Sequence, residues 1–174
     1  MIPTYLDKLQ RITTFVLDVD GVLTDGKVYI TPDNMIMRSM HTKDGLAVKH
    51  AIDQGYRVVI ISGGRDENIL PRLKNLGVRD IFLHITDKRP VLEKYLQTHG
   101  IAPENVAYMG DDIPDIAPMQ AVGLAVCPAN AAPEVKAAAH WITARNGGDA
   151  CVRELIEKVM KIRGDWFPKL QTNE

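Results

Sequence analysis

Two carboxylates stand side by side where an apolar segment ends. Asp18 and Asp20 follow TTFVL in the sequence TTFVLDVDGVLTDG, residues 13–26. A β-branched apolar run predicts a buried strand, and ionised carboxylates are costly to bury there without a partner. Side chains two residues apart on a strand point the same way, about 6–7 Å apart. We therefore expect Asp18 and Asp20 to face one site that holds a cation.

A second acidic group, GDDIPD at residues 110–115, follows another apolar segment. So many carboxylates cannot all ionise in one place without a cation. A set of oxygen ligands with no His or Cys suits a hard ion, most simply Mg²⁺, which keeps water ligands and recruits substrate phosphate. A calcium loop of the EF-hand type is excluded, because Gly21 comes too early and Tyr29 occupies the twelfth position.

Two further groups have the chemistry to hold an anion. Ser62, Gly63 and Gly64 follow the apolar run RVVII and precede a helical pattern, where backbone N–H groups and the helix dipole attract negative charge. Lys88 begins a helix, a poor place for a cation unless it meets a phosphate or a carboxylate. Each group taken alone also fits an ordinary turn or a solvated lysine. The nucleotide-binding patterns GxxxxGK[ST] and GxGxxG are absent.

The rest of the chain predicts the elements that position these groups. Strand-like apolar segments occur at 13–19, 57–62, 80–83, 106–110, 123–126 and 140–143. Helical spacing of apolar residues occurs at 45–54, 67–76, 89–98, 133–139 and 151–162. Strands that are apolar throughout predict an α/β fold, a doubly wound parallel sheet with helices on both faces. All four polar groups then lie at the carboxyl ends of strands, the edge where such sheets bind ligands.

One segment breaks this alternation. Residues 27–40 read as a β-hairpin closed by a turn at 31–34. A lone hairpin is only marginally stable in water, so its apolar face needs a cover. The apolar residues on it are Val28, Ile30, Met35, Met37 and Met40.

Length and composition limit the possible functions. The 174 residues suit one domain spanning 1–174, with 45% apolar and 25% charged residues. A net charge of −1 gives no electrostatic footprint for nucleic acid. The amino terminus is interrupted by Asp7, Lys8 and Arg11, so it is neither a signal peptide nor a membrane span. We expect two reduced cysteines, a cytoplasmic location and no membrane partner.

The DxD pair, the Ser-Gly turn, the lysine and GDDxxD, in this order, resemble the haloacid dehalogenase superfamily of phosphotransferases over nearly the whole chain. The resemblance implies that Asp18 is a nucleophile that takes the phosphoryl group as an aspartyl phosphate. It implies that Asp20 is the general acid and base, that Ser62 holds a phosphoryl oxygen, and that Lys88 neutralises phosphate and nucleophile. Mg²⁺ would be held by Asp18, the backbone carbonyl of Asp20, and Asp111.

A closer resemblance is to the 3-deoxy-D-manno-octulosonate 8-phosphate phosphatase family. It is carried by LDVDGVLTDGKVYI, the hairpin, HTKDGLAVKHA, ENVAYMGDDIPD and GGDACVRE. The family implies no cap domain and a homotetramer, in which the hairpin (27–40) and the C-terminal tail (164–174) of a neighbour help close each active site. The substrate contacts that it implies are His41, Thr42, Lys43, Asp44, Gly45, Lys49, Gly63, Gly64, Arg65 and Arg72.

Three positions depart from the family pattern. Gly64 stands where an arginine usually follows S/T-G, and Arg65 comes one place later. His41 replaces a common asparagine, and residues 147–150 read GGDA where Gly-Gly-x-Gly is usual. An eight-carbon and a nine-carbon sugar acid therefore both remain open as substrates, as does the glycan that the product feeds, lipopolysaccharide or another.

Two functions other than a phosphatase are also compatible with an α/β fold. A non-catalytic domain, similar to one attached to some sialic acid activating enzymes, could lose Asp18, Asp20 or Lys88, yet all three are present. A receiver-type signalling domain accepts phosphate on a later strand. The sequence therefore favours an enzyme, a Mg²⁺-dependent phosphoric monoester hydrolase. The closer resemblance implies 3-deoxy-D-manno-octulosonate 8-phosphate as its substrate, with the nine-carbon acid 9-phosphate as the alternative.

Overall fold

A six-stranded parallel sheet forms the centre of the molecule. The computed structural model describes residues 5–167. The strands are β1 (Thr14–Leu17), β4 (Arg57–Ile61), β5 (Asp80–Phe82), β6 (Val106–Met109), β7 (Leu124–Cys127) and β8 (Trp141–Ile142). Their order is β5-β4-β1-β6-β7-β8, with β1 paired in parallel to both β4 and β6. The predicted doubly wound α/β class is confirmed.

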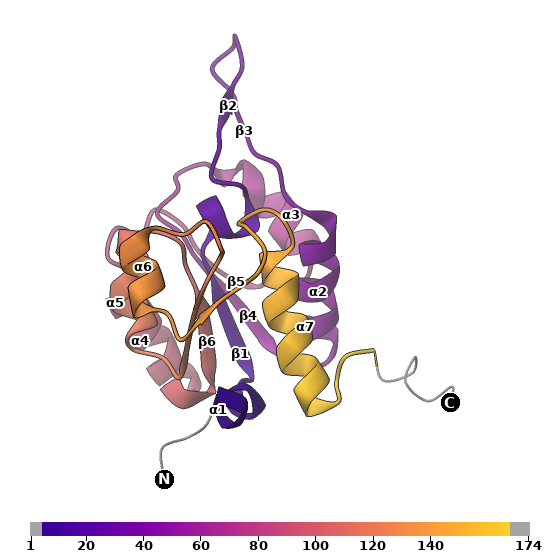
Figure 1. Ribbon diagram of the computed structural model, residues 1–174. Helices are drawn as coiled ribbons and strands as arrows, with labels where there is room; N and C mark the ends of the chain where they lie inside the picture. The colour runs from indigo at the N-terminus through magenta and orange to yellow at the C-terminus, as the bar shows by residue number, and fades with distance from the viewer. Residues whose placement is uncertain (1–4, 168–174) are drawn as a thin grey trace.

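Helices cover both faces of this sheet (Figure 1). They are α1 (Tyr5–Arg11), α2 (Thr42–Asp53), α3 (Leu70–Asn75), α4 (Lys88–His99), α5 (Ile116–Met119), α6 (Pro133–Ala138) and α7 (Cys151–Arg163). Helices α2 and α7 pack against each other on one face, while α4, α5 and α6 lie on the other. No helix within residues 5–167 is long and apolar enough to cross a membrane.

The sequence of the central strands explains why both faces are covered. In β1, Phe15 and Leu17 belong to the apolar core under α2 and α7, whereas Val16 belongs to the core under α4. All three are completely buried. A strand that points apolar side chains to both faces of the sheet must be covered on both sides, as the continuous apolar pattern predicts.

The predicted hairpin is present and projects beyond the carboxyl end of the sheet (Figure 1). Strands β2 (Tyr29–Ile30) and β3 (Ile36–Met37) pair antiparallel, and Thr31 N–H donates to the carbonyl of Met35 across the turn. No cap domain is inserted anywhere in the described residues 5–167.

Several element boundaries differ from the sequence expectation. The first strand ends at Leu17 rather than residue 19, because the chain enters η1 (Val19–Leu23), a wide turn in which Gly21 has φ 81°. Helix α2 begins at Thr42 rather than residue 45, since the His41 ring accepts a hydrogen bond from Lys43 N–H and caps the helix. Helices α1 and α5 were not expected, because both are short and have little periodic signal.

Part of the predicted C-terminal tail can be located. Trp166 is buried beside the ring of His50, a residue of α2 in the same chain. Phe167 N–H donates to His50 Nε2, and the Tyr56 hydroxyl donates to Asp165 at 2.6 Å. The start of the tail therefore folds back on its own subunit. Residues 168–174 lie outside the described chain.

We predict that two leucines of α1 differ sharply in their contribution to stability. Leu9 is completely buried in the core, whereas Leu6 is 57% exposed. Leu9→Ala should lower the free energy of unfolding by about 2–5 kcal/mol, because it removes buried methyl groups and leaves a cavity. Leu6→Ala, the same chemical change on the same helix, should cost less than about 0.5 kcal/mol. Urea unfolding measures both, and equal losses would contradict this packing of α1.

Candidate active site

Asp18 is held at the end of β1 by hydrogen bonds on both sides. Its backbone N–H donates to the carbonyl of Met109 on β6, and its Oδ1 accepts from Val19 N–H at 2.7 Å. The side chain is nearly buried. Because its Oδ1 is fixed by η1, its Oδ2 is directed toward the other strand ends.

Lys88 lies between two buried carboxylates. Its Nζ is 2.8 Å from Asp18 Oδ2 and 2.7 Å from Asp115 Oδ1, and all three side chains are at least nine-tenths buried. Burial alone would lower the pKa of Lys88, but the charges of Asp18 and Asp115 outweigh it and the net shift is upward. The lysine is therefore a fixed positive charge beside Asp18.

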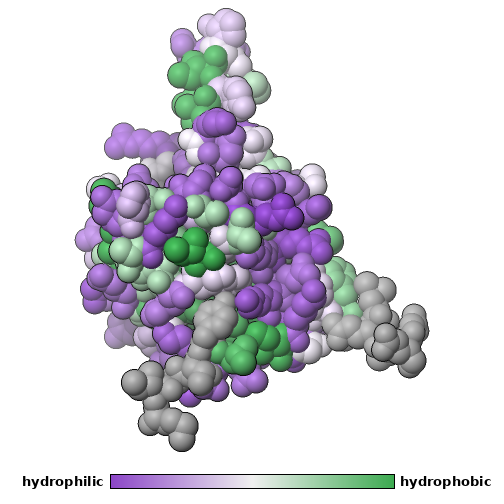
Figure 2. Space-filling model, viewed as in Figure 1, coloured by the Kyte–Doolittle hydropathy of each residue, from purple (hydrophilic) through white to green (hydrophobic). Residues whose placement is uncertain are grey.

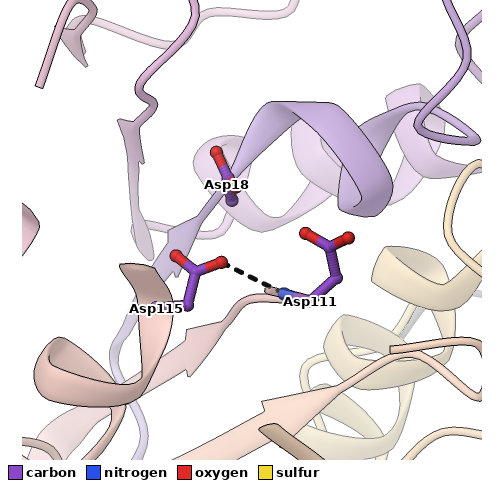
Figure 3. A group of neighbouring side chains, drawn as sticks. All are labelled: Asp18, Asp111 and Asp115. Carbon is purple, nitrogen blue, oxygen red and sulfur yellow. Dashed lines mark hydrogen bonds between the residues drawn. The ribbon is translucent and has the colours of Figure 1, made fainter. Parts of the chain in front are cut away.

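Asp115 is fully used as an anchor. Its Oδ1 also accepts from the Tyr108 hydroxyl at 2.8 Å. Its Oδ2 accepts from the backbone N–H of Asp111 at 3.1 Å (Figure 3) and from the backbone N–H of Asp112. These bonds hold the GDDIPD turn and Lys88 in one arrangement. The acidic motif alone predicts that Asp115 belongs to the cation site, whereas in the structure Asp115 forms an ion pair with Lys88.

The remaining carboxylates fit a divalent cation. Oxygen atoms of Asp18, Asp111 and Asp115 all lie within 4.8 Å of one another. Asp115 is engaged by four donors, so Asp18 and Asp111 are the side chains left for a cation. Gly21 makes room for them: a Cβ at this position would lie 1.9 Å from Asp111 Oδ2.

The pKa values of these acids are raised, which favours the binding of a cation beside them. Burial, followed by the charges of Asp18 and Asp115, raises the pKa of Asp111 from 3.8 to about 7. Burial and the charge of Asp115 raise the pKa of Asp18 to about 6, against the opposing effect of Lys88. Without a cation, the site therefore takes up protons near neutral pH. A hard divalent ion with oxygen ligands would replace those protons.

The turn after β4 forms the opposite wall of the same cavity. Ser62, Gly63 and Gly64 line it together with Asp18, Asp20, Lys88 and Asp111, in a volume of about 460 Å³. Ser62 is buried, and its Oγ accepts from Gly64 N–H at 3.2 Å. The structure thus brings together every residue to which the sequence assigned a catalytic or metal-binding role.

Sequence reasoning missed the partner of Asp20. Arg38, the residue after β3, places its Nε 2.6 Å from Asp20 Oδ1 and its Nη1 2.6 Å from Asp66 Oδ2. The base of the hairpin is thereby attached to the candidate general acid. Nothing local in RSMHT distinguishes this arginine from one that is solvated.

The predicted contacts between residues 41 and 45 do not line this cavity. His41 and Lys43 line a second groove of about 680 Å³ between the start of α2 and α7. Thr42 is exposed. Asp44 is buried, with Oδ1 accepting from Arg153 N–H at 2.7 Å, so within one subunit it stabilises the packing of α7 on α2.

The remaining predicted contacts also lie outside the cavity in a single chain. Lys49 is exposed and pairs with Asp53 one turn along α2, at 3.5 Å. Arg65 is exposed. Arg72 packs over Gly45, where a Cβ would lie 2.5 Å from its guanidinium. Within one subunit, these positions are separate from the cluster around Asp18.

The GGDA segment has a clear packing role. A Cβ at Gly147 would lie 1.8 Å from the carbonyl oxygen of Gly21, and Gly148 N–H donates to the carbonyl of Val22 at 3.0 Å. Both glycines therefore let this loop press against η1. The fourth position, Ala150, adopts φ 67°, a conformation that glycine takes more readily.

Comparisons with known proteins agree with this geometry. A family model described as haloacid dehalogenase-like hydrolase matches residues 79–155. The 3-deoxy-D-manno-octulosonate 8-phosphate phosphatase KdsC of Salmonella typhimurium is 33% identical over 162 residues, which cover 93% of this chain and 86% of that protein.

Solved structures show the same similarity along most of the chain. The 3-deoxy-D-manno-octulosonate 8-phosphate phosphatase of Yersinia pestis has a TM-score of 0.90 and 30% identity, covering 92% of this chain and 87% of that one. The corresponding phosphatase of Moraxella catarrhalis, solved with magnesium, phosphate and KDO, has a TM-score of 0.93, 27% identity and full coverage of both chains.

We predict that Asp111→Asn stabilises the metal-free protein at pH 8. Because the folded state raises the pKa of Asp111 from 3.8 to about 7, the folded chain binds a proton that the unfolded chain has released between these values. Stability without metal therefore falls as pH rises through this window. In chelator the variant should melt above the wild type at pH 8, with a smaller difference near pH 4.

Magnesium should reverse that order. The wild type should gain melting temperature when Mg²⁺ is added at pH 8, and Asp111→Asn should gain much less. Asp53→Asn is the matched control, because it makes the same change at an exposed carboxylate far from the cavity. A wild type whose melting temperature ignores both pH in chelator and added Mg²⁺ would contradict the cation site.

Proposed function

This chain belongs to the 3-deoxy-D-manno-octulosonate 8-phosphate phosphatase family of haloacid dehalogenase-like hydrolases, and we propose that it hydrolyses that sugar phosphate to the free sugar acid and phosphate. One observation of the chain itself carries the proposal. The Lys88 ammonium, the Asp18 carboxylate and the Asp111 carboxylate meet at one end of a cavity with room for a phosphate. Phosphoryl transfer depends on this kind of charge neutralisation and positioning.

Magnesium is the cofactor that this proposal requires. Asp18, Asp111 and the backbone carbonyl of Asp20 would hold it, as the donor set of hard oxygens suggests. When bound, it neutralises charge on the phosphate and on the carboxylates around it. The Moraxella catarrhalis relative contains a magnesium ion and a phosphate ion, which supports this assignment.

The residues of the chain divide the reaction into two steps. Asp18 attacks the phosphorus through the carboxylate that Lys88 orients, and an aspartyl phosphate results. Asp20 protonates the departing sugar oxygen and later takes a proton from the water that hydrolyses the aspartyl phosphate. Ser62 and the N–H group of Gly63 hold the phosphoryl oxygens during both steps.

The acidic end of the sugar needs cations that this cavity does not supply. Among the described residues that line it, Lys88 is the one cation, and it is already paired with two carboxylates. His41 and Lys43 lie in the separate groove. We therefore propose that the predicted contacts at residues 41–45, 49, 65 and 72 serve the active site of another subunit.

The hairpin supplies a surface for such an assembly. Its exposed apolar side chains gather at one end of the molecule (Figure 2) and are Val28, Tyr29, Ile30, Met35, Ile36 and Met37. Exposed apolar patches of this kind mark interfaces. We propose that the hairpin packs against neighbouring copies in a homotetramer and that the tail at 164–174 takes part in closing the site.

The cellular setting is proposed on the same basis. Both Cys127 and Cys151 are buried and free, which fits a reducing cytoplasm. The free sugar acid would enter glycan synthesis, and lipopolysaccharide is the glycan that we propose.

The substrate is tested by a panel of phosphorylated keto-deoxy sugar acids. We predict that kcat/KM is highest for 3-deoxy-D-manno-octulosonate 8-phosphate, that it exceeds the value for the nine-carbon 9-phosphate, and that turnover stops in chelator. Asp18→Asn should abolish turnover without unfolding, because the amide is not a nucleophile. A preference for the nine-carbon acid would change the substrate, and turnover by Asp18→Asn would overturn the mechanism.

Assembly is tested at the hairpin. Ile30 is 71% exposed near its tip, and Ile30→Asp should lower both the oligomer mass and kcat/KM, the latter by at least about tenfold, because a buried unpaired carboxylate is costly in an interface. Leu6→Asp places the same charge on α1, at the opposite end of the molecule (Figure 1), and should change neither. Light scattering after size exclusion gives the mass, and a fully active monomer would contradict the proposal.

A further inference from the structure

Arg38 connects the hairpin to the catalytic cavity through a two-ended ion pair. On one side its guanidinium binds Asp20 with both Nε, at 2.6 Å, and Nη2, at 3.4 Å. On the other side Nη1 binds Asp66 at 2.6 Å. A guanidinium that contacts both oxygens of a carboxylate fixes its orientation as well as its charge.

Asp66, which binds the other side of the Arg38 guanidinium, is itself held in place. Asp66 Oδ1 accepts from Asn68 N–H at 3.0 Å and begins the helical turn η2 (Glu67–Ile69). The side chains of Arg38 and Asp66 are 10% and 14% exposed, whereas that of Asp20 is 38% exposed. The contact between Arg38 and Asp66 is therefore largely buried, whereas Asp20 is more exposed and faces the cavity.

From this arrangement, and resting on the function proposed above, we propose that Arg38 is a positioning residue for proton transfer by Asp20. In the first step, a proton moves from Asp20 to the oxygen of the departing sugar, and negative charge develops on the carboxylate. The guanidinium keeps all its protons and stabilises that charge. In the second step, Asp20 recovers a proton from the attacking water, so the cycle closes without a further reactant.

The turn after β4 does not provide this cation. Gly64 lies so close to Asp20 that a Cβ there would be 3.2 Å from Asp20 Oδ2 and 3.4 Å from Ser62 Oγ. Arg65 is exposed and does not line the cavity. The guanidinium at Asp20 comes instead from the base of the hairpin, 18 residues along the chain.

The position of Arg38 next to the hairpin links Asp20 to assembly. Arg38 follows β3 directly, so a displacement of the hairpin moves the guanidinium relative to Asp20. Packing of the hairpin against another subunit would therefore also fix the orientation of the general acid.

Leaving-group dependence tests the proposal. Phenyl phosphates with poor leaving groups need a proton from Asp20, whereas p-nitrophenyl phosphate does not. In single-turnover measurements, Arg38→Met should slow phenol release about 10- to 100-fold for the poorest leaving group, within the range of general acid catalysis, and less than about threefold for p-nitrophenyl phosphate. Arg38→Lys should recover part of the loss.

The controls separate this role from a structural one. Lys94→Met removes an exposed cation from α4, outside both the hairpin and the cavity, and should behave like the wild type. In an Asp20→Asn background, Arg38→Met should have no further effect, since its action passes through the missing carboxylate. If Arg38→Met does not fold, Asp66→Asn loosens the anchor and should show the same leaving-group pattern more weakly.

Two results would overturn the inference: an equal loss for all leaving groups, or a further loss when Arg38→Met is added to Asp20→Asn. Both require an active wild type. A wild type that releases no phenol from any of these phosphates would instead contradict the proposed phosphatase function.

Discussion

The contact of Lys88 with Asp18 and Asp115 is the interaction on which the site depends. The carboxyl ends of β1 and β6 bring buried acids within 4.8 Å of one another, an arrangement that repulsion would disperse if no cation were present. The first residue of α4 supplies one positive charge, and burial makes its attraction to both carboxylates strong. The pKa of Asp111, raised to about 7 by burial and by the charges of Asp18 and Asp115, indicates that one lysine does not balance these acids, and a divalent ion would complete the balance.

The parallel sheet makes this concentration of charge possible. Because β1 lies between β4 and β6, the loops that follow all three strands open at the same edge. The close approach of these loops depends on missing side chains: Gly21 leaves room for Asp111, and Gly147 lets its loop touch η1. The strands β1 and β6 beneath are buried along their whole length and hold the edge rigid, which limits how far the acidic groups can move apart to relieve their repulsion.

Much of this was predictable from the sequence, and the failures have physical reasons. Strand ends are marked by a change from apolar to polar residues, so the positions of Asp18 and Lys88 followed from the pattern. The role of Asp115 did not, because a motif lists its acids without saying which of them binds the lysine. Arg38 was missed because the fold brings it to Asp20 from 18 residues along the chain, a contact that no local pattern encodes. For the same reason, the sequence could not show that His41 faces a different groove.

The open cavity and the exposed hairpin both need a covering surface. A site that water enters freely weakens every charge interaction in it, and a hairpin with unsatisfied apolar side chains is unstable alone. The subunit contact proposed above would meet both needs, since a surface that covers the hairpin would also exclude water from the cavity beside it. Arg38 connects the two features, because its backbone directly follows strand β3 of the hairpin and its guanidinium binds Asp20. Under these proposals, the hairpin would take part both in assembly and in orienting Asp20.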